Sequence, residues 1–161
     1  MSPPPPVPSA AHQLSRLDEL AALPFPAEER RSAASHGWSG PGYHFEVLRE
    51  SRDFWESRAE ELVEAAESEI EAARAALAAV LTARWGPART VELWPYLGSG
   101  HPDPGYQAPE PLSLLAGLAA GMEVWRPPGT ERWVALAVGQ ADPEFPVHLL
   151  AAIGHGPLPG P

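Results

Sequence analysis

The sequence contains no cysteine, no lysine and no asparagine among its 161 residues. The absence of cysteine excludes disulfide bonds, thiolate zinc sites and a cysteine nucleophile. Because lysine is absent, all 11 basic residues are arginine; they stand against 21 acidic residues, and the formal net charge is -10. Phosphate contacts need clustered basic residues, so this balance argues against sequence-independent binding of nucleic acid.

Long hydrophobic runs are missing as well. The longest, residues 112–122, is interrupted by serine and glycine, and it is far shorter than the roughly 20 residues that a membrane-spanning helix needs. The N-terminus carries Pro3–Pro6 in place of the basic and apolar regions of a secretory signal. We therefore expect a cytoplasmic protein with no membrane partner.

Proline and glycine, by contrast, are plentiful, with 21 and 14 residues. They are frequent before residue 43, over residues 95–111 and after residue 154, where they disfavour regular structure. Residues 1–42 are expected to form a Pro/Gly-rich N-terminal arm, in which leucines at every third position predict a short helix over residues 12–23. Residues 43–154 then form an α+β domain, and residues 155–161 a disordered tail.

Residues 43–85 contain neither glycine nor proline and are rich in Ala, Glu, Arg and Leu, which are good helix formers. This composition predicts one uninterrupted helix over residues 43–85, ending at Gly86 and Pro87. Apolar residues spaced three, four or seven apart give it one buried face. They are Leu48, Trp55, Leu62, Ala66, Ile70, Ala73, Leu77 and Val80 or Leu81.

Alternating apolar residues after this helix predict four strands, and Pro111 predicts the start of a short helix over residues 111–120. The strands are expected at residues 90–94, 123–126, 132–139 and 147–153. An antiparallel sheet of about four strands with the long helix across one face is the expected architecture.

The long predicted helix is strongly acidic. Four of its carboxylates recur at helical spacing and would form one acidic ridge: Glu60, Glu64, Glu67 and Glu71. Such a ridge is either a solvated face or a surface that meets a basic partner, where it would speed association and set specificity. Exposed Trp38 and Tyr43 are candidate aromatic anchors for that partner, because aromatic residues are frequent hot spots.

Candidate ligating or catalytic residues are few, and they occur near predicted loops: His101, Asp103, Asp142, Glu144 and His148. The spacing of His101 and Asp103 would allow both to bind one metal ion. However, Asp before Pro is also a common turn former, and a His in a Pro/Gly loop is usually only exposed. No phosphate-binding glycine loop and no Gly-x-Ser-x-Gly motif occurs. We therefore expect no metal, no cofactor and no enzymatic activity.

The C-terminal third resembles a known pattern. Residues 123–126 and 132–140, followed by Asp142-Pro143-Glu144-Phe145-Pro146 and an apolar strand, resemble small bacterial proteins, some of them similar to immunity proteins of polymorphic toxin systems. The resemblance covers about 30 residues and includes neither the proline-rich start nor the long helix. It implies a non-enzymatic protein that binds another protein.

Two functional hypotheses follow. The first is a non-enzymatic protein-binding module, of immunity or adaptor type, that binds a cationic protein through the acidic ridge. The second is a structural or assembly subunit that self-associates, or pairs with another helix, through its own long helix. The seven-residue repeat Leu48, Trp55, Leu62 supports this alternative, because it could form a short coiled-coil seam.

Overall fold

The computed structural model describes residues 10–31, 37–97 and 102–160. Within these residues the chain forms an α+β fold in which three helices pack on one seven-stranded antiparallel sheet. The helices are α1 (Ala10–Ala22), α2 (Glu60–Trp85) and α3 (Leu112–Leu118), with a short 3-10 helix, η1, at Trp94–Tyr96. The prediction of an α+β fold with an antiparallel sheet is confirmed.

The sheet has more strands than the sequence predicts. The strands are β1 (Arg30–Arg31), β2 (Gly37–Gly40), β3 (Tyr43–Glu50), β4 (Arg89–Glu92), β5 (Gly121–Trp125), β6 (Arg132–Gly139) and β7 (His148–His155). Their order across the sheet is β1-β2-β3-β7-β6-β5-β4, so the last strand of the chain lies at the centre. The predicted strand over residues 132–139 is confirmed, and the other three predicted strands lie within a few residues of the observed ones.

The prediction of one helix over residues 43–85 is wrong. Residues 43–50 form β3, residues 51–59 form an irregular connection, and only Glu60–Trp85 is helical. In β3, Tyr43 and Phe45 face one side of the sheet, while His44 and Glu46 face the other. Both faces of β3 are buried nonetheless, and the polar side chains are tolerated there because His44 and Glu46 make hydrogen bonds.

The start of the chain also contributes to the sheet. Strands β1 and β2 fall inside the segment that was expected to be an arm and linker, and β2 pairs with β3 along its length. The predicted short helix is confirmed as α1. The proline tract at residues 3–6 lies outside the described residues.

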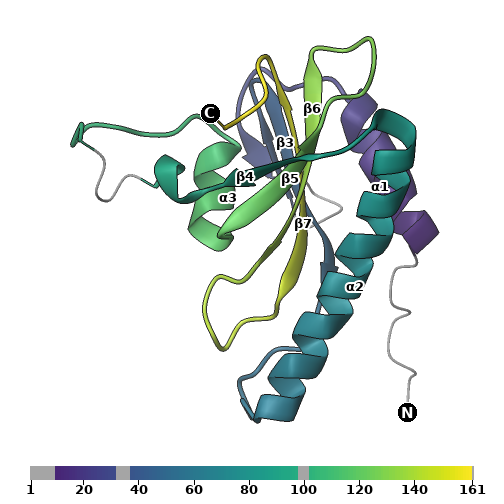
Figure 1. Ribbon diagram of the computed structural model, residues 1–161. Coiled ribbons are helices and arrows are strands. Elements are labelled where there is room, and N and C mark those ends of the chain that lie inside the picture. The colour runs from purple at the N-terminus through teal and green to yellow at the C-terminus, as the bar shows by residue number, and fades with distance from the viewer. Residues whose placement is uncertain (1–9, 32–36, 98–101, 161) are drawn as a thin grey trace.

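The sheet separates two hydrophobic cores (Figure 1). Helices α1 and α2 cover one face, where Leu77 and Leu81 of α2 meet Trp125 and Leu149. Helix α3, η1 and, from the loop between them, Tyr106 and Ala108 cover the other face. The central strand β7 is apolar on both sides for this reason, and its residues 149–153 are 0% exposed.

A β-bulge in β3 directs two successive residues toward α2. The register between β3 and β7 shifts between Val47 and Arg49. Leu48 joins the core beneath α2, as alternation from His44 and Glu46 requires. The shift turns the next side chain, Arg49, to the same face, where it reaches Glu69 of α2 at 2.8 Å.

The boundaries of α2 have local causes. Two glutamates, Glu60 and Glu61, occupy its first turn, where a negative charge suits the helix dipole. At the other end Gly86 has a φ of 89°, and its N–H donates to the Thr82 carbonyl at 2.9 Å, which ends the helix.

The segment after β7, expected to form a disordered tail, lies against the protein through residue 160. The Gly156 N–H donates to the Glu131 carbonyl, and the Gly160 N–H donates to the Tyr96 hydroxyl at 2.9 Å. Among the described residues, no helix is long and apolar enough to cross a membrane.

Candidate functional site

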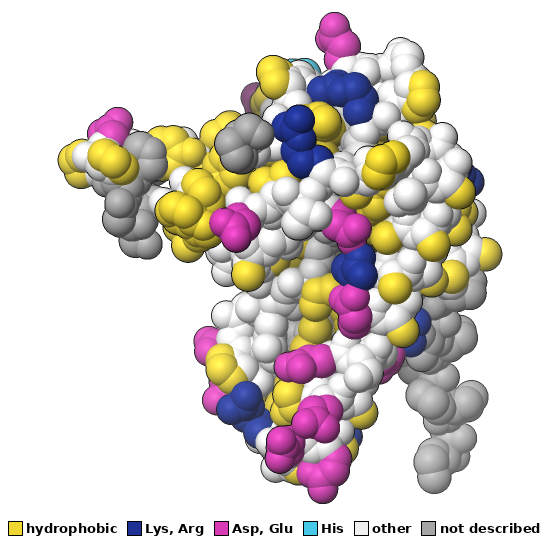
Figure 2. Space-filling model, in the orientation of Figure 1, with side chains coloured by type: hydrophobic (Ala, Val, Ile, Leu, Met, Phe, Trp, Pro, Cys, Tyr) yellow, Lys and Arg dark blue, Asp and Glu magenta, His cyan; other side chains and the backbone are white. Residues whose placement is uncertain are grey.

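The four carboxylates of the acidic ridge are all exposed on the first half of α2. That half carries six glutamates and no arginine before Arg74. The opposite side of the helix is apolar and packs on the sheet through Ala66, Ile70 and Ala73. Asp and Glu side chains therefore gather along one end of the helix, on the face turned to the viewer in Figure 2.

The ridge borders an open groove with a volume of about 690 Å³. Glu64, Glu67 and Glu71 form one wall together with Ser68. The rest of the lining comes from the end of α3 and the residues that follow it, from the end of β6, and from the residue before β7. These residues are Leu118, Ala119, Ala120, Val138, Gly139, Gln140 and Val147. One wall is thus acidic, and most of the rest is apolar or backbone.

The groove has its shape because α3 ends directly on β6. The Gln140 N–H donates to the Leu118 carbonyl at 2.9 Å. A Cβ atom placed on Gly139 would lie 2.7 Å from that same carbonyl oxygen, so only glycine permits this approach. This contact fixes the apolar wall opposite the carboxylates.

Two members of the ridge on the groove wall keep their charge unneutralised. Among the described residues, no cation pairs with Glu64 or Glu67. Glu71 differs, because Arg74 binds it at 2.6 Å and also binds Glu123 of β5. The hydrogen bonds from Arg74 hold the pKa of Glu71 below its ordinary value, so this carboxylate stays ionised.

A second, smaller hollow of about 260 Å³ adjoins the groove and shares Glu71 and Val138 with it. It runs beside α2 over β5 and β4, where Thr90 and Glu123 face the helix side of the sheet. The two hollows together give a continuous depression along one flank of α2.

The two aromatic anchors expected from the sequence do not belong to this groove. Trp38 is 43% exposed on β2, near the other edge of the sheet, where the Arg31 guanidinium lies 5.5 Å from its ring centroid. Tyr43 is only 4% exposed, and its hydroxyl donates to Glu29 at 3.3 Å. The expectation of an exposed tyrosine is therefore wrong. Burial, together with the nearby Glu29, also raises the pKa of Tyr43 to about 12.

The candidate metal ligands that the structure describes, Asp103, Asp142, Glu144 and His148, do not form a metal site. No group of three or more His, Asp or Glu residues in the described ranges could hold a metal ion. Asp103 accepts a hydrogen bond from the Gly105 N–H at 2.9 Å, and Asp142 starts a turn closed by Phe145. His148 contacts Glu50 at 3.0 Å, and Glu144 lies in the turn before β7. His101 lies outside the described residues.

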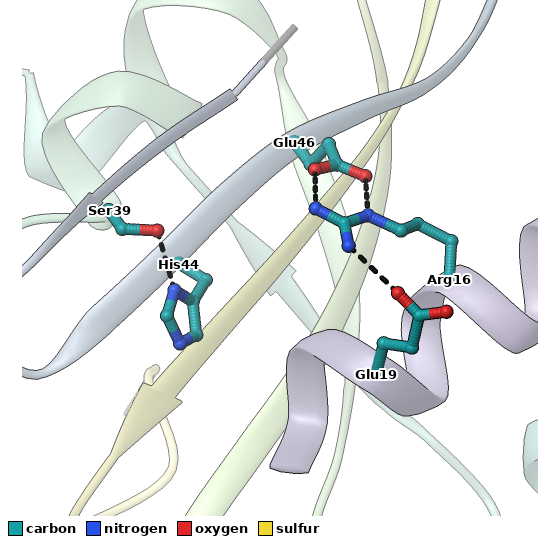
Figure 3. A network of polar contacts seen from close by, with 5 residues as sticks. All are labelled: Arg16, Glu19, Ser39, His44 and Glu46. Carbon is teal, nitrogen blue, oxygen red and sulfur yellow. Dashed lines mark hydrogen bonds and ion pairs between the residues drawn. The ribbon is translucent and has the colours of Figure 1, made fainter. Parts of the chain in front are cut away.

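A buried polar network joins α1 to β3 (Figure 3). Arg16 of α1 donates two hydrogen bonds of 2.6 Å to the carboxylate of Glu46, which is 3% exposed, and a third to Glu19. The hydrogen bonds to Glu46, and to a lesser extent the one to Glu19, hold the pKa of Arg16 above its ordinary value. The arrangement is a bidentate ion pair of the strong kind.

His44, the next member of the network, has both ring nitrogens occupied. Its Nε2 lies 2.9 Å from the Leu23 carbonyl, which can only accept, so Nε2 carries the proton and Nδ1 accepts from the Ser39 hydroxyl at 2.6 Å. Burial lowers the pKa of His44, with smaller contributions from nearby arginines. The ring is 1% exposed and links α1 to the β2–β3 hairpin.

One exposed aromatic pair was missed by sequence reasoning. Trp55 and Phe145 are 59% and 39% exposed, and their rings meet edge to face at 5.0 Å. The sequence pattern predicts Trp55 on the buried face of a helix over residues 43–85. The adjacent serines Ser51 and Ser57 were the signal that this stretch turns, since serine favours turns and helix caps over helix interiors.

Comparison of the chain with family models, curated proteins and solved structures found no match.

Proposed function

We propose that this chain is a non-enzymatic protein-binding module, and that a basic segment of the partner protein binds in the groove beside α2. The observation that carries the proposal is the lining of that groove, in which unneutralised Glu64 and Glu67 face an apolar wall. A groove with one charged and one apolar wall suits an amphipathic segment whose charged side is cationic.

The spacing of the carboxylates specifies the form of the segment. Glu60 to Glu71 extends over three helical turns, about 16 Å at 1.5 Å per residue. A second helix that lies along α2 repeats its side chains with the same period, so arginines three and four residues apart would face the carboxylates in turn. We therefore propose that the partner supplies a basic amphipathic helix.

The test uses a fluorescently labelled peptide of about 15 residues, with arginines three and four apart on one face and Ala and Leu on the other. Its affinity is measured by fluorescence anisotropy at several salt concentrations. We expect saturable binding that weakens steeply as salt rises, because the contacts are between exposed charges. Replacement of each arginine by citrulline, which is neutral, should abolish this dependence.

The matched variants are Glu64→Lys/Glu67→Lys in the groove and Glu28→Lys/Glu131→Lys elsewhere on the surface. All four residues are exposed, so the two variants change the net charge equally. We expect the groove variant to bind about tenfold more weakly and the control to stay within about twofold. Equal losses in both variants, or no binding below about 1 mM, would contradict the proposal.

Self-association through the long helix is the alternative hypothesis. Its residue basis was the repeat Leu48, Trp55, Leu62, whose members now lie in β3, in the connection and in α2. Light scattering coupled to size exclusion separates the two hypotheses. A mass of one chain favours the binding module, and a stable dimer favours the assembly subunit.

A further inference from the structure

Outside the groove lining, two exposed aromatic rings, Trp55 and Phe145, contact each other on the surface. Trp55 and Phe145, at 59% and 39% exposure, meet in one apolar surface patch, and such patches mark protein interaction sites. Aromatic residues also dominate the binding energy of many protein interfaces.

The loop that carries Trp55 is held firmly against the body of the protein. The neighbouring Phe54 is 1% exposed and anchors the loop in the core, and its N–H donates to the Glu144 carbonyl at 2.9 Å. The Ser51 N–H donates to the Val147 carbonyl, and the Ser51 hydroxyl accepts from the Val147 N–H, both at 2.9 Å. The exposed Trp55 ring is thus presented on a fixed backbone.

The turn that carries Phe145 is equally constrained. The Gln140 side-chain amide donates to the Phe145 carbonyl at 2.8 Å, and the Phe145 N–H donates to the Asp142 carbonyl at 2.9 Å. Pro143 and Pro146 restrict the backbone on either side. A partner that covers the pair therefore loses little entropy to order it.

The ring pair adjoins the acidic groove. Val147, which joins the two loops through its hydrogen bonds with Ser51, and Gln140, which braces the Phe145 turn, also line the groove. Trp55 lies in the connection that enters α2 at Glu60, at the end of the helix where the ridge begins. The two loops meet at that same end of α2 in Figure 1.

We propose that the Trp55–Phe145 pair binds the side chain of an arginine at one end of the basic helix that occupies the groove. This inference rests on the proposed function and adds the anchor point to it. An edge-to-face pair covers at most one face of each ring, which leaves Trp55 with a face for a planar guanidinium.

The experiment uses the arginine peptide described above and a second peptide in which only the terminal arginine is citrulline. Both are titrated against the wild-type protein and against Trp55→Leu, Phe145→Leu and, as control, Trp38→Leu. Trp38 is an exposed tryptophan on β2, next to the edge strand β1, and it does not line the groove. Because Trp55 and Phe145 are largely exposed, circular dichroism should show the same fold for all variants.

We expect Trp55→Leu and Phe145→Leu each to weaken binding of the arginine peptide about threefold to tenfold, and Trp38→Leu to leave it unchanged. The citrulline substitution should weaken binding to the wild type but have little further effect on Trp55→Leu, since both changes remove the same contact.

Independent losses from the two substitutions, or a loss with Trp38→Leu equal to that with Trp55→Leu, would overturn the anchor. If this happens while Glu64→Lys/Glu67→Lys still weakens binding, the proposed function stands and only this inference fails. If neither the ring variants nor the charge variant affects binding, both fail.

Discussion

The ion pair between Arg16 and Glu46 is the most demanding interaction of the molecule at the scale of single residues. Glu46 lies on the core side of β3 at 3% exposure, where an ionised carboxylate is stable only if it is well bonded. Two hydrogen bonds of 2.6 Å from one guanidinium meet that need. The pair also fixes the position of α1 on the sheet.

Replacement of Arg16 by methionine should therefore destabilise the protein by about 3 kcal/mol, because Glu46 loses both charge-assisted hydrogen bonds while it remains buried. Chemical denaturation monitored by tryptophan fluorescence would measure the loss. The double variant Arg16→Met/Glu46→Gln should recover part of it.

The control for this prediction is Arg84→Met, which removes the exposed ion pair between Arg84 and Asp18 at 3.0 Å. That change should cost less than about 1 kcal/mol, since exposed pairs contribute little. Similar losses for Arg16→Met and Arg84→Met would show that burial of Glu46 does not matter.

The sequence could predict the exposed carboxylates of α2 but not the exposure of the aromatic residues. Glu64 and Glu67 follow helical spacing from a buried stripe, and charge makes their burial costly wherever they lie. Tyr43 and Trp55 can be buried or exposed at similar cost, so their environment depends on the tertiary structure. For this reason the sequence predictions of an exposed Tyr43 and a buried Trp55 are both wrong.

At the scale of secondary structure, the boundary between β3 and α2 is a feature that the local sequence does not determine. The absence of glycine and proline over residues 43–59 permits a helix but does not require one. Strand pairing decides the matter here, since β3 forms a hairpin with β2 and also pairs with β7, which lies at the far end of the chain, beyond any local sequence window. The strands β6 and β7 were predictable because their apolar runs end at turn residues.

The contact between β6 and β7 gives a prediction at this scale. Trp133 pairs with Gly154, and a Cβ atom on Gly154 would lie 2.1 Å from the Trp133 ring. Trp133 is 4% exposed and cannot move aside without disturbing the core. We expect Gly154→Ala to lower the free energy of unfolding by about 2 to 3 kcal/mol.

Gly117→Ala is the matched control, because nothing lies within 4 Å of its added Cβ atom and the position is helical. That substitution should be neutral or slightly stabilising. Thermal denaturation measures the melting temperatures of Gly154→Ala and Gly117→Ala against the wild type. A melting temperature for Gly154→Ala equal to that of the wild type would refute the steric argument.

For the whole molecule, the decisive feature is a sheet covered on both faces. The sequence indicated one layer of helix on a sheet, because α2 dominates the helical signal. The second layer consists of the seven-residue α3, η1 and a proline-rich loop, whose packing depends on contacts between distant segments. The groove forms where α3 ends on β6, so it too was beyond prediction from local patterns.

This arrangement predicts a gradient of local stability across the sheet. Backbone amides of β6 and β7, between the two cores, should exchange with solvent only through global unfolding. Amides of β1 and β4, at the two edges, should exchange about a hundredfold faster or more. Native-state hydrogen exchange followed by NMR measures this, and uniform protection of all seven strands would rule the gradient out.

The lengths of the outermost strands have a practical consequence. Strand β1 has two residues and β4 has four, so each leaves only a short row of backbone groups open to pairing with another sheet. Arg30 and Arg31 form all of β1, which places like charges opposite each other whenever two copies approach along that margin. Concentrated solutions of the protein should therefore resist the edge-to-edge stacking that leads to fibrils.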